Sequence, residues 1–246
     1  MDSKLRGFLH EYNKKRLAKY ATDFWACSKD AVDWFFSDQN KEKAIVVPNA
    51  IDVEKSAFSN EARRQIRSQL GWYDCYIIGN VGSFHFQKNH DFIVDVFNEY
   101  QKIDNSARLV MIGQGEDEKV IKRKIIDLGL EDKVCMPGLQ SNISDWLSAF
   151  DLFFFPSRFE GLSIAALEAQ ANGVPVLASA DVMSDEVKVN DNFVFFPLSQ
   201  GIEKWSEKVG EMKNTIYRLP NDIIIKGFIS CNLELCSQIM KVEKLL

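Results

Sequence analysis

The chain is poor in the residues that build disulfide frameworks and metal sites. Its 246 residues include five cysteines and three histidines, and no two cysteines are spaced as CxxC. An odd number of scattered cysteines argues against a disulfide scaffold, and the few histidines form no cluster with metal-ligand spacing. These absences exclude a disulfide-rich secreted module and a zinc-finger-like module, and they favour a reduced, cytoplasmic compartment.

The chain also lacks long apolar runs and an excess of positive charge. No run reaches the roughly 18 apolar residues of a membrane span, and the polar first residues lack the apolar segment of a signal peptide. The formal net charge is −5, so the composition does not indicate a nucleic-acid partner. With 46% hydrophobic and 26% charged residues, the chain is typical of a soluble globular protein with one large or two small domains.

What the sequence does contain is an alternation of strand and helix patterns from about Tyr76 onward. Apolar runs predict strands at 76–81, 108–112, 133–136, 152–155 and 174–179. Helical periodicity predicts helices at 91–101, 116–128, 143–150 and 163–172. This rhythm with short loops is typical of an α/β fold with a doubly wound parallel sheet, in which ligands bind at the carboxyl ends of the strands.

The two ends of the chain have other patterns. An apolar stripe with helical spacing lies among lysines and arginines at Leu5, Phe8, Leu9, Tyr12 and Leu17. It predicts either a helix packed on its own protein, which is favoured, or peripheral contact with an anionic membrane. Strands are predicted at 24–27 and 43–47, and a terminal helix in the tail after residue 221. We therefore divide the chain into regions 1–48, 49–214 and 215–246.

The most informative pair of residues is Glu160 and Glu168. Glu160 lies in a glycine-containing turn after a predicted strand, and Glu168 lies among Ala, Leu and Ile, where a carboxylate carries a desolvation penalty unless it has a partner. In a continuous helix the two would be roughly 12 Å apart, whereas glycosidase carboxyl groups lie about 5 Å or about 6.5–9.5 Å apart. The pair therefore suits the binding of the two ends of one elongated ligand. The alternative has similar weight: Glu160 is solvated in its turn, and the side chain of Glu168 extends from its helix to solvent.

Two further loops follow predicted strands. Lys88, in the loop 82–89, offers a point charge for a phosphate, although an isolated solvated lysine is the commoner case. Gly113 and Gly115 allow a backbone to approach a ligand closely. They lack the third glycine of the dinucleotide fingerprint and the lysine of a P-loop, so they are weak evidence alone.

The start of the predicted helix 163–172 is a candidate anion site. The backbone amides of Leu162, Ser163 and Ile164 lie at its N-terminus, where the helix dipole favours negative charge. The alternative is an ordinary Ser-capped helix. Together with Lys88 for phosphates and the two glutamates for hydroxyl groups, these amides fit a nucleoside diphosphate sugar.

In their order and spacing, the motifs resemble those of the group 1 (family 4) retaining glycosyltransferases with the GT-B fold, especially the bacterial exopolysaccharide and capsule type. The matching segments are 46–52, 79–90, 112–115, 128–130, 156–157, 159–162, 168–171 and 173–176. Each is weak alone, but their order is specific. The resemblance covers about residues 20–214, and it implies that the chain is the C-terminal, donor-binding Rossmann-like half.

The resemblance implies a role for each site residue. Glu160 contacts the donor sugar as the catalytic carboxylate, Glu168 binds the ribose, and residues 134–138 line the base. The residues that bind the diphosphate, or form the loops around it, are Lys88, Gly82, Ser83, Gly113, Gly115, Leu162, Ser163 and Ile164. The implied reaction transfers a sugar from a UDP- or GDP-sugar to a hydroxyl acceptor with retention and without a metal. A lipid-linked glycan acceptor and a position at the inner face of the membrane follow from the same resemblance.

The chain departs from the family in two ways. Ser83 stands where the family usually has an arginine, and a charge-assisted contact is worth about 1.5–3 kcal/mol; a protonated His85 is a partial substitute. The first 48 residues resemble just the last elements of the acceptor-side half. One hypothesis is therefore an enzyme whose sequence is truncated here or is completed by a partner chain. The other is an inactive sugar-nucleotide-binding or regulatory subunit.

An exposed apolar surface that includes Phe84 and Phe86 is expected where the other half docks. A response-regulator-like or reductase domain would share the fold. It is disfavoured, because the chain lacks the acidic cluster of the first and the full glycine fingerprint of the second.

Overall fold

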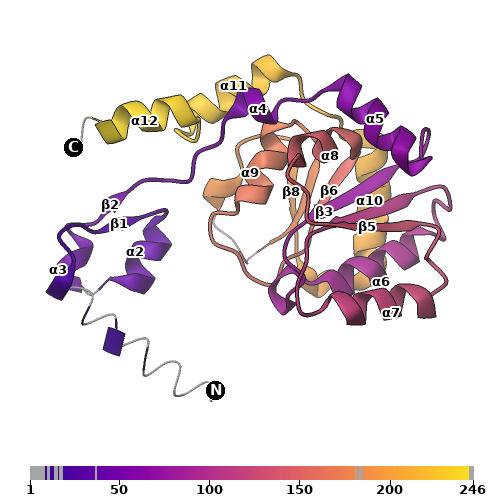
Figure 1. Cartoon of the computed structure of the whole chain (residues 1–246), viewed down its shortest axis with the longest axis horizontal. Coiled ribbons are helices and arrows are strands. Elements are labelled where there is room, and N and C mark those ends of the chain that lie inside the picture. The colour runs from indigo at the N-terminus through magenta and orange to yellow at the C-terminus, as the bar shows by residue number, and fades with distance from the viewer. Residues whose placement is uncertain are drawn as a thin grey trace.

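A six-stranded parallel sheet forms the centre of the main body (Figure 1). In spatial order its strands are β5 (Val134–Gly138), β4 (Arg108–Ile112), β3 (Ile77–Val81), β6 (Leu152–Phe155), β7 (Val176–Ser179) and β8 (Phe193–Phe196). The computed structural model describes residues 9, 12, 13, 16, 19–36, 38–180, 182 and 185–243. The order places β3 beside β6 at the centre, where the direction of winding reverses. The predicted α/β class with a doubly wound parallel sheet is confirmed.

Helices cover both faces of this sheet. On one face lie α5 (Asn60–Leu70), α8 (Ile143–Ala149), α9 (Ile164–Ala171) and α11 (Asn221–Ser230). On the other face lie α6 (His90–Tyr100), α7 (Glu118–Asp127) and α10 (Gly201–Thr215). Successive strand residues point to opposite faces, so Phe153 packs in the first apolar cluster and Phe154 in the second. Strands buried on both faces explain the continuous apolar runs of the sequence.

The elements of the main body that have weak sequence signals and were not predicted include α5, β8 and α10. Helix α5 has mostly polar residues on its exposed side and buries Ile66 on its inner side. β8 has four residues, and its place in the sheet depends on β7 beside it. The tail forms two helices instead of the single one predicted, because Asn232 (φ 55°) ends α11 before α12 (Leu235–Glu243).

A small unit lies apart from the main body at the left of Figure 1. In it β1 (Trp25–Ala26) pairs in parallel with β2 (Ile45–Val46), and α2 (Lys29–Phe35) and α3 (Asp38–Lys41) connect them. Both strands are shorter than predicted. The basic apolar stripe near the N-terminus lies largely outside the described residues.

The segment between β2 and the short helix α4 (Val53–Ser56) joins the two parts. Its Ile51 N–H donates to the Leu233 carbonyl at 2.9 Å, and the Leu235 N–H donates to the Ile51 carbonyl at 3.1 Å. These bonds fasten the segment to the turn between α11 and α12. From this turn α12 runs back toward the small unit (Figure 1).

A cluster of arginines around Asp151 holds the amino-terminal edge of the sheet. Arg63 and Arg67 contact the two carboxylate oxygens of Asp151 at 2.6 and 2.5 Å. The Ile77 N–H donates to the same carboxylate at 2.8 Å. Arg218 donates to the Phe150 carbonyl at 2.6 Å, and burial lowers the pKa of Arg218 to about 9. This cluster ties α5, β3 and the end of α8 together at the edge opposite the carboxyl ends of the strands.

Candidate functional site

Two loops meet at the carboxyl ends of the neighbouring strands β3 and β6. The Arg158 N–H donates to the Gln87 carbonyl at 2.8 Å, and the Gln87 amide donates to the Phe159 carbonyl at 3.0 Å. The Asn89 amide donates to the Pro156 carbonyl at 3.0 Å, with Asn89 itself in the left-handed region (φ 60°). These bonds fix the β3 loop against the β6 loop, so side chains from both are held in one place.

Lys88 and Glu160 form an ion pair between these loops. The Lys88 ammonium donates to Glu160 Oε1 at 2.7 Å, and the side chains are 15% and 5% exposed. The ammonium also lies 4.8 Å from the centre of the Phe155 ring, a cation–π contact that the sequence analysis did not identify. The sequence placed Lys88 at the phosphates and Glu160 at the sugar; the structure brings the two groups into direct contact.

Gly113 and Gly115 allow the β4 loop to pack closely on the β3 loop. Gly113 has φ 143°, and a Cβ atom there would lie 2.0 Å from the Gly82 carbonyl oxygen. A Cβ atom on Gly115 would lie 2.3 Å from the Phe84 carbonyl oxygen. These glycines therefore permit a close approach between the β4 loop and the β3 loop. Their contact with a ligand stays a prediction.

Ser83 is exposed at the tip of the β3 loop, beside the glycine contacts. His85, the substitute cation suggested by the sequence, points to an acidic neighbour, because its Nδ1 lies 3.3 Å from Glu116 Oε1. The position for which the resemblance implies an arginine is thus occupied by a small neutral side chain on the surface.

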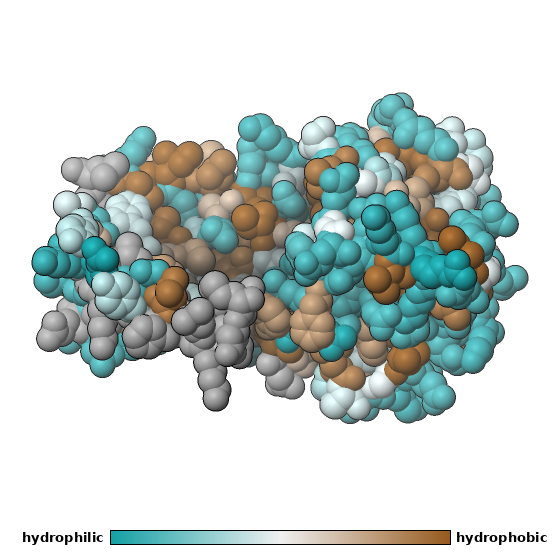
Figure 2. Space-filling model, turned by 60° about the horizontal axis from the view of Figure 1, so that its bottom comes forward, coloured by the Kyte–Doolittle hydropathy of each residue, from teal (hydrophilic) through white to brown (hydrophobic). Residues whose placement is uncertain are grey.

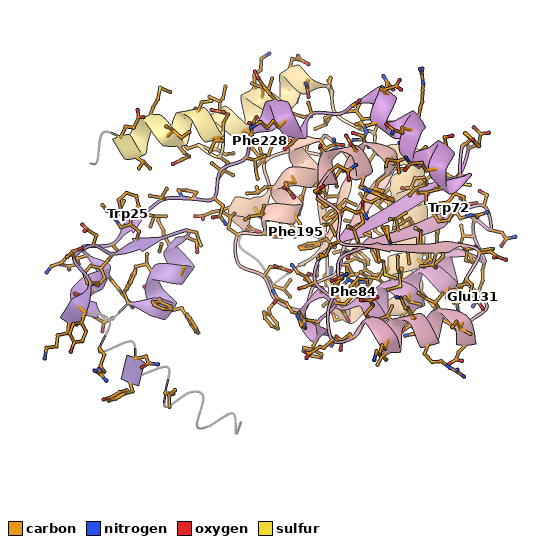
Figure 3. All side chains as sticks on the ribbon, in the orientation of Figure 1. Trp25, Trp72, Phe84, Glu131, Phe195 and Phe228 are labelled. Atoms are coloured by element: carbon orange, nitrogen blue, oxygen red, sulfur yellow. The ribbon has the colours of Figure 1, made fainter. Side chains whose placement is uncertain are left out.

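The prediction that Phe84 lies on an exposed apolar surface is wrong. Its ring is fully buried in the main body (Figure 3), stacked on His90 with a centroid distance of 4.0 Å. The β3 loop turns Phe84 inward because its N–H donates to the Gln114 carbonyl at 2.9 Å. Phe86 is 65% exposed, as predicted, and the Arg158 guanidinium lies 4.3 Å from its ring centre.

The start of α9 presents backbone donors without acceptors. The hydroxyl of Ser163 caps the helix by accepting from the Ala166 N–H. In the described part of the chain, the N–H groups of Leu162, Ser163 and Ile164 donate to no acceptor. Free amides at a helix start are a ready site for an anion.

The carbonyl of Leu162 has a partner from far away in the sequence. The Asn49 side chain, in the segment after β2, donates to it at 3.2 Å. Asn49 belongs to the matching segment 46–52, but nothing in the local sequence indicates this contact.

Glu168 lies on α9, past the start of the helix, and Glu160 precedes the helix in a loop, so helical spacing does not apply between them. The Glu168 carboxylate is half-buried, and among the described residues no side chain or backbone group pairs with it. Burial raises its pKa above the ordinary glutamate value. A desolvated carboxylate without a partner is suited to accept hydrogen bonds from a ligand.

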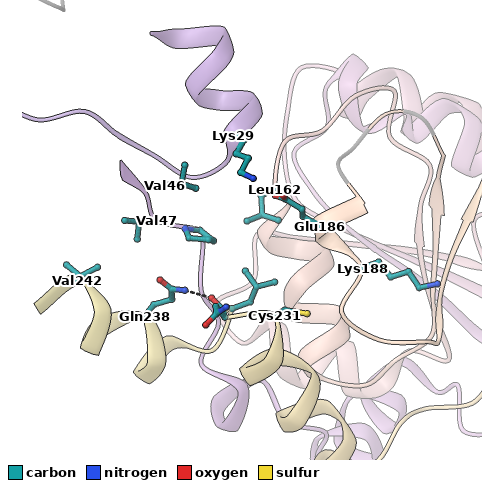
Figure 4. A pocket seen from close by; sticks show the side chains of 12 residues that line it. Lys29, Val46, Val47, Leu162, Glu186, Lys188, Cys231, Gln238 and Val242 are labelled. Atoms are coloured by element: carbon teal, nitrogen blue, oxygen red, sulfur yellow. Dashed lines mark hydrogen bonds between the residues drawn. The ribbon is translucent and has the colours of Figure 1, made fainter. Parts of the chain in front are cut away.

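A cavity of about 470 Å³ adjoins the start of α9 (Figure 4). Leu162 forms part of its wall, and the small unit and the α11–α12 turn contribute Val46, Pro48 and Leu233. Gln238 lies on another wall, and its side chain is hydrogen-bonded to Asn232. Within the described residues there is no group of three or more metal-ligating side chains, and no helix there is long and apolar enough to cross a membrane.

Apolar side chains are exposed on the small unit and on α12. They are Trp25, Trp34, Phe35, Val46, Ile239 and Met240. Figure 2 shows apolar groups gathered on the left part of the molecule, where Figure 1 has these elements. Exposed apolar groups of this kind are typical of a surface that contacts another protein or domain.

The sequence matches the family model described as "Glycosyl transferases group 1" over residues 62–220. It is 31% identical over 193 residues to the putative glycosyltransferase EpsF of Bacillus subtilis, a match that covers 77% of this chain and 50% of EpsF. It is 33% identical over 107 residues to the lipopolysaccharide core mannosyltransferase LpsB of Rhizobium meliloti, covering 42% of this chain and 30% of LpsB. The chain spans about half, or less, of the length of these relatives.

Solved structures share the fold at low sequence identity. HepE of Anabaena, solved in complex with UDP and glucose, has a TM-score of 0.79 at 17% identity, covering 96% of this chain and 66% of HepE. The sucrose-phosphate synthase of Thermosynechococcus elongatus has a TM-score of 0.75 at 17% identity, covering 96% of this chain and 60% of that protein.

Proposed function

This chain belongs to the family of group 1 glycosyltransferases, and we propose that it is the C-terminal, donor-binding half of a retaining enzyme of the GT-B type. The observation that carries the proposal is the meeting of three features beside the junction of β3 and β6. These are the Lys88–Glu160 pair and, within the described residues, the acceptor-free amides of α9 and the unpaired Glu168 carboxylate. A parallel sheet binds its ligand at such a switch point.

The proposed donor is a nucleoside diphosphate sugar, either a UDP- or a GDP-sugar. The amides of α9 and Lys88 bind the diphosphate, Glu168 accepts hydrogen bonds from the ribose hydroxyl groups, and residues 134–138 line the base. Solved relatives of this fold support the donor class, since HepE was solved in complex with UDP-glucose.

In the proposed reaction the nucleoside diphosphate is the leaving group. Negative charge on it grows as the sugar–phosphate bond breaks, and fixed donors aimed at that charge lower the barrier without a metal ion. Lys88 is already close to Glu160, so an arriving diphosphate shares the ammonium with this carboxylate. Glu160 then accepts a hydrogen bond from a hydroxyl of the donor sugar.

The acceptor is proposed to be a hydroxyl group of a lipid-linked glycan in exopolysaccharide or capsule synthesis, used at the inner face of the membrane in the cytoplasm. The similarity to a relative named as a Vi polysaccharide biosynthesis protein of Salmonella typhi, 29% identical over 102 residues, supports this assignment. So does a relative named as a galactosyltransferase acting on a diphosphoundecaprenol-linked sugar, which is 30% identical over 142 residues.

The acceptor-side half is proposed to pack on the small unit, supplied either by a further part of the same protein or by a partner chain. The two-stranded parallel sheet β1–β2 and the exposed apolar groups around it support this, because parallel sheets are normally wider and covered on both faces. Ser83, which stands where the resemblance implies an arginine, favours a second candidate function. This is a sugar-nucleotide-binding or regulatory subunit that does not turn over its ligand.

Calorimetry with UDP, GDP and their sugars tests the donor site. We expect UDP or GDP to bind, and Glu168→Ala to weaken binding, whereas the exposed Glu207→Ala on α10 should leave it unchanged. Absence of binding by every nucleotide would contradict both candidates. Sugar transfer or donor hydrolysis, measured with and without candidate partner chains, then separates the enzyme from the binding subunit.

A further inference from the structure

The segment that joins the small unit to the main body contacts the start of α9 through one side chain. The Asn49 amide donates to the Leu162 carbonyl at 3.2 Å across 113 positions of sequence. The carbonyl belongs to the same peptide group as the N–H of Ser163. Because this group is planar and trans, its C=O and N–H point in opposite directions. A partner that holds the carbonyl therefore also sets the direction of the Ser163 N–H.

The Ser163 N–H is one of the amides that have no acceptor in the described part of the chain. Its own side chain is engaged in capping Ala166, so it does not fix the preceding peptide group. The residue before Leu162 is Gly161, which is exposed and has open space around its α-carbon. A glycine adds backbone freedom immediately before the donor peptide. The hydrogen bond from Asn49 opposes that freedom.

Asn49 is itself held in place. Two residues further on, Ile51 is buried, and its backbone is bonded on both sides to the α11–α12 turn. The donor side chain therefore projects from an anchored strand-like segment, and its position is set by the tertiary structure rather than by α9.

We propose that Asn49 is a positioning residue that aims the Ser163 N–H at the phosphate of the bound donor. This inference rests on the proposed function, since it assumes that the amides of α9 bind the diphosphate. Asn49 does not touch the ligand in this arrangement. It acts through the Leu162–Ser163 peptide group, and it links the connecting segment to the phosphate site.

The test is calorimetric titration of the whole chain with UDP, UMP and uridine, comparing wild type with Asn49→Asp and Asn49→Ala. Asn49→Asp keeps the shape of the side chain but removes the N–H donor and places a charge beside the carbonyl oxygen. We expect UDP affinity to fall roughly tenfold in both variants, a change that corresponds to one hydrogen bond. Uridine affinity should stay unchanged, because uridine has no phosphate.

Asn214→Asp is the matched control. Its amide donates to the Gly210 carbonyl at 2.9 Å on the exposed side of α10, so it loses the same kind of bond far from the site. It should leave UDP, UMP and uridine affinities unchanged. Uridine binding also serves as the internal check that each Asn49 variant is folded.

The outcomes distinguish a failure of the proposed phosphate site from a failure of the positioning role of Asn49. If wild type binds UDP no more tightly than uridine, the proposed phosphate site is wrong. If wild type prefers UDP and the Asn49 variants keep the full preference, or lose uridine and UDP affinity equally, Asn49 is a structural residue and the positioning role is wrong.

Discussion

The Lys88 ammonium lies 2.7 Å from the Glu160 carboxylate, and neither side chain has more than a small part of its surface exposed. The pair joins the loops after β3 and β6, which are far apart in sequence and adjacent in the sheet. In a poorly solvated position each charge depends on the other, because an isolated buried charge is costly. The same two groups are those that the resemblance assigns to the diphosphate and the donor sugar.

Removing one member of this pair should destabilise the fold. Lys88→Met leaves Glu160 without its partner, and we expect the free energy of unfolding to fall by about 3–5 kcal/mol. The double variant with Glu160→Gln should lose less than the sum of the two single variants, because no charge is then left unpaired. Urea unfolding measures all three. Lys102→Met, which breaks an exposed pair with Glu99, should change stability by less than about 1 kcal/mol; an equal loss there would contradict the argument.

Glu168 should make nucleoside binding depend on pH. Its pKa is raised by burial, so it protonates at a higher pH than an ordinary glutamate. Protonation removes acceptor capacity for the ribose hydroxyl groups, and uridine affinity should therefore fall as the pH is lowered through this raised value. Glu168→Gln should bind uridine weakly and without this dependence. A wild-type profile that is flat between neutral pH and the ordinary glutamate value would exclude the role.

The raised pKa of Glu168 also affects the stability of the fold. Low pH weakens ligand binding by this residue, but it favours the folded chain. The folded chain holds the Glu168 proton more tightly than the unfolded chain does, so this residue contributes a loss of stability as the pH rises through the window between the two pKa values. Glu168→Gln should remove that loss and be more stable than wild type at neutral pH. Thermal unfolding across pH, without ligand, measures the difference.

Ser83→Arg should strengthen the diphosphate site. The residue is exposed in the same loop as Lys88, and an added charge-assisted contact is worth about 1.5–3 kcal/mol. We expect UDP affinity to rise at least tenfold at low salt, with less gain at high salt and none for uridine. Asn214→Arg, on the exposed side of α10, controls for the added charge. A similar gain in the control would show a general electrostatic effect.

Gly113→Ala should disrupt the packing of the β4 loop on the β3 loop. The added Cβ would lie 2.0 Å from the Gly82 carbonyl oxygen, and φ at this position is 143°. We expect a loss of at least about 2 kcal/mol in unfolding free energy together with weaker UDP binding. Gly129→Ala also has positive φ (65°) but has nothing within 4 Å of its Cβ, so it should cost about 1 kcal/mol and leave UDP binding unchanged. Denaturant titration and calorimetry are made on both variants. They show whether the loss comes from the positive φ, which both positions share, or from the contact with Gly82, which only Gly113→Ala makes.

Asp151→Asn should destabilise the chain without altering the donor site. It removes the carboxylate that Arg63, Arg67 and the Ile77 N–H share, and we expect a loss of about 3 kcal/mol. UDP affinity, measured where the variant is folded, should match wild type, because the cluster lies at the opposite edge of the sheet. Asp127→Asn, which breaks an exposed pair with Arg123, is the control and should have an effect near zero.

The strands and helices of the main body were largely predictable from residues 76–179. The apolar run at β6 is buried on both faces, and its pattern is visible in any window of the sequence. The helix of α9 was predicted from its Ser cap and from the Gly173 that follows it. Helix α5 and strand β8 were not predicted, because a helix with few apolar residues and a four-residue strand carry little local signal. Contacts with α8 and β7 stabilise them.

The sequence by itself determined which chemical groups this protein carries: the two glutamates, the lysine, the glycine turns, the helix start, and the serine in place of an arginine. Their order along the chain sufficed to indicate the family. The tertiary structure decided how these groups meet. It paired Lys88 with Glu160, left Glu168 without a partner among the residues that the structure describes, turned Phe84 inward, and placed Asn49 beside the Leu162 carbonyl. These contacts join segments far apart in sequence, and they form because strand order and loop packing bring the segments together, which no local pattern encodes.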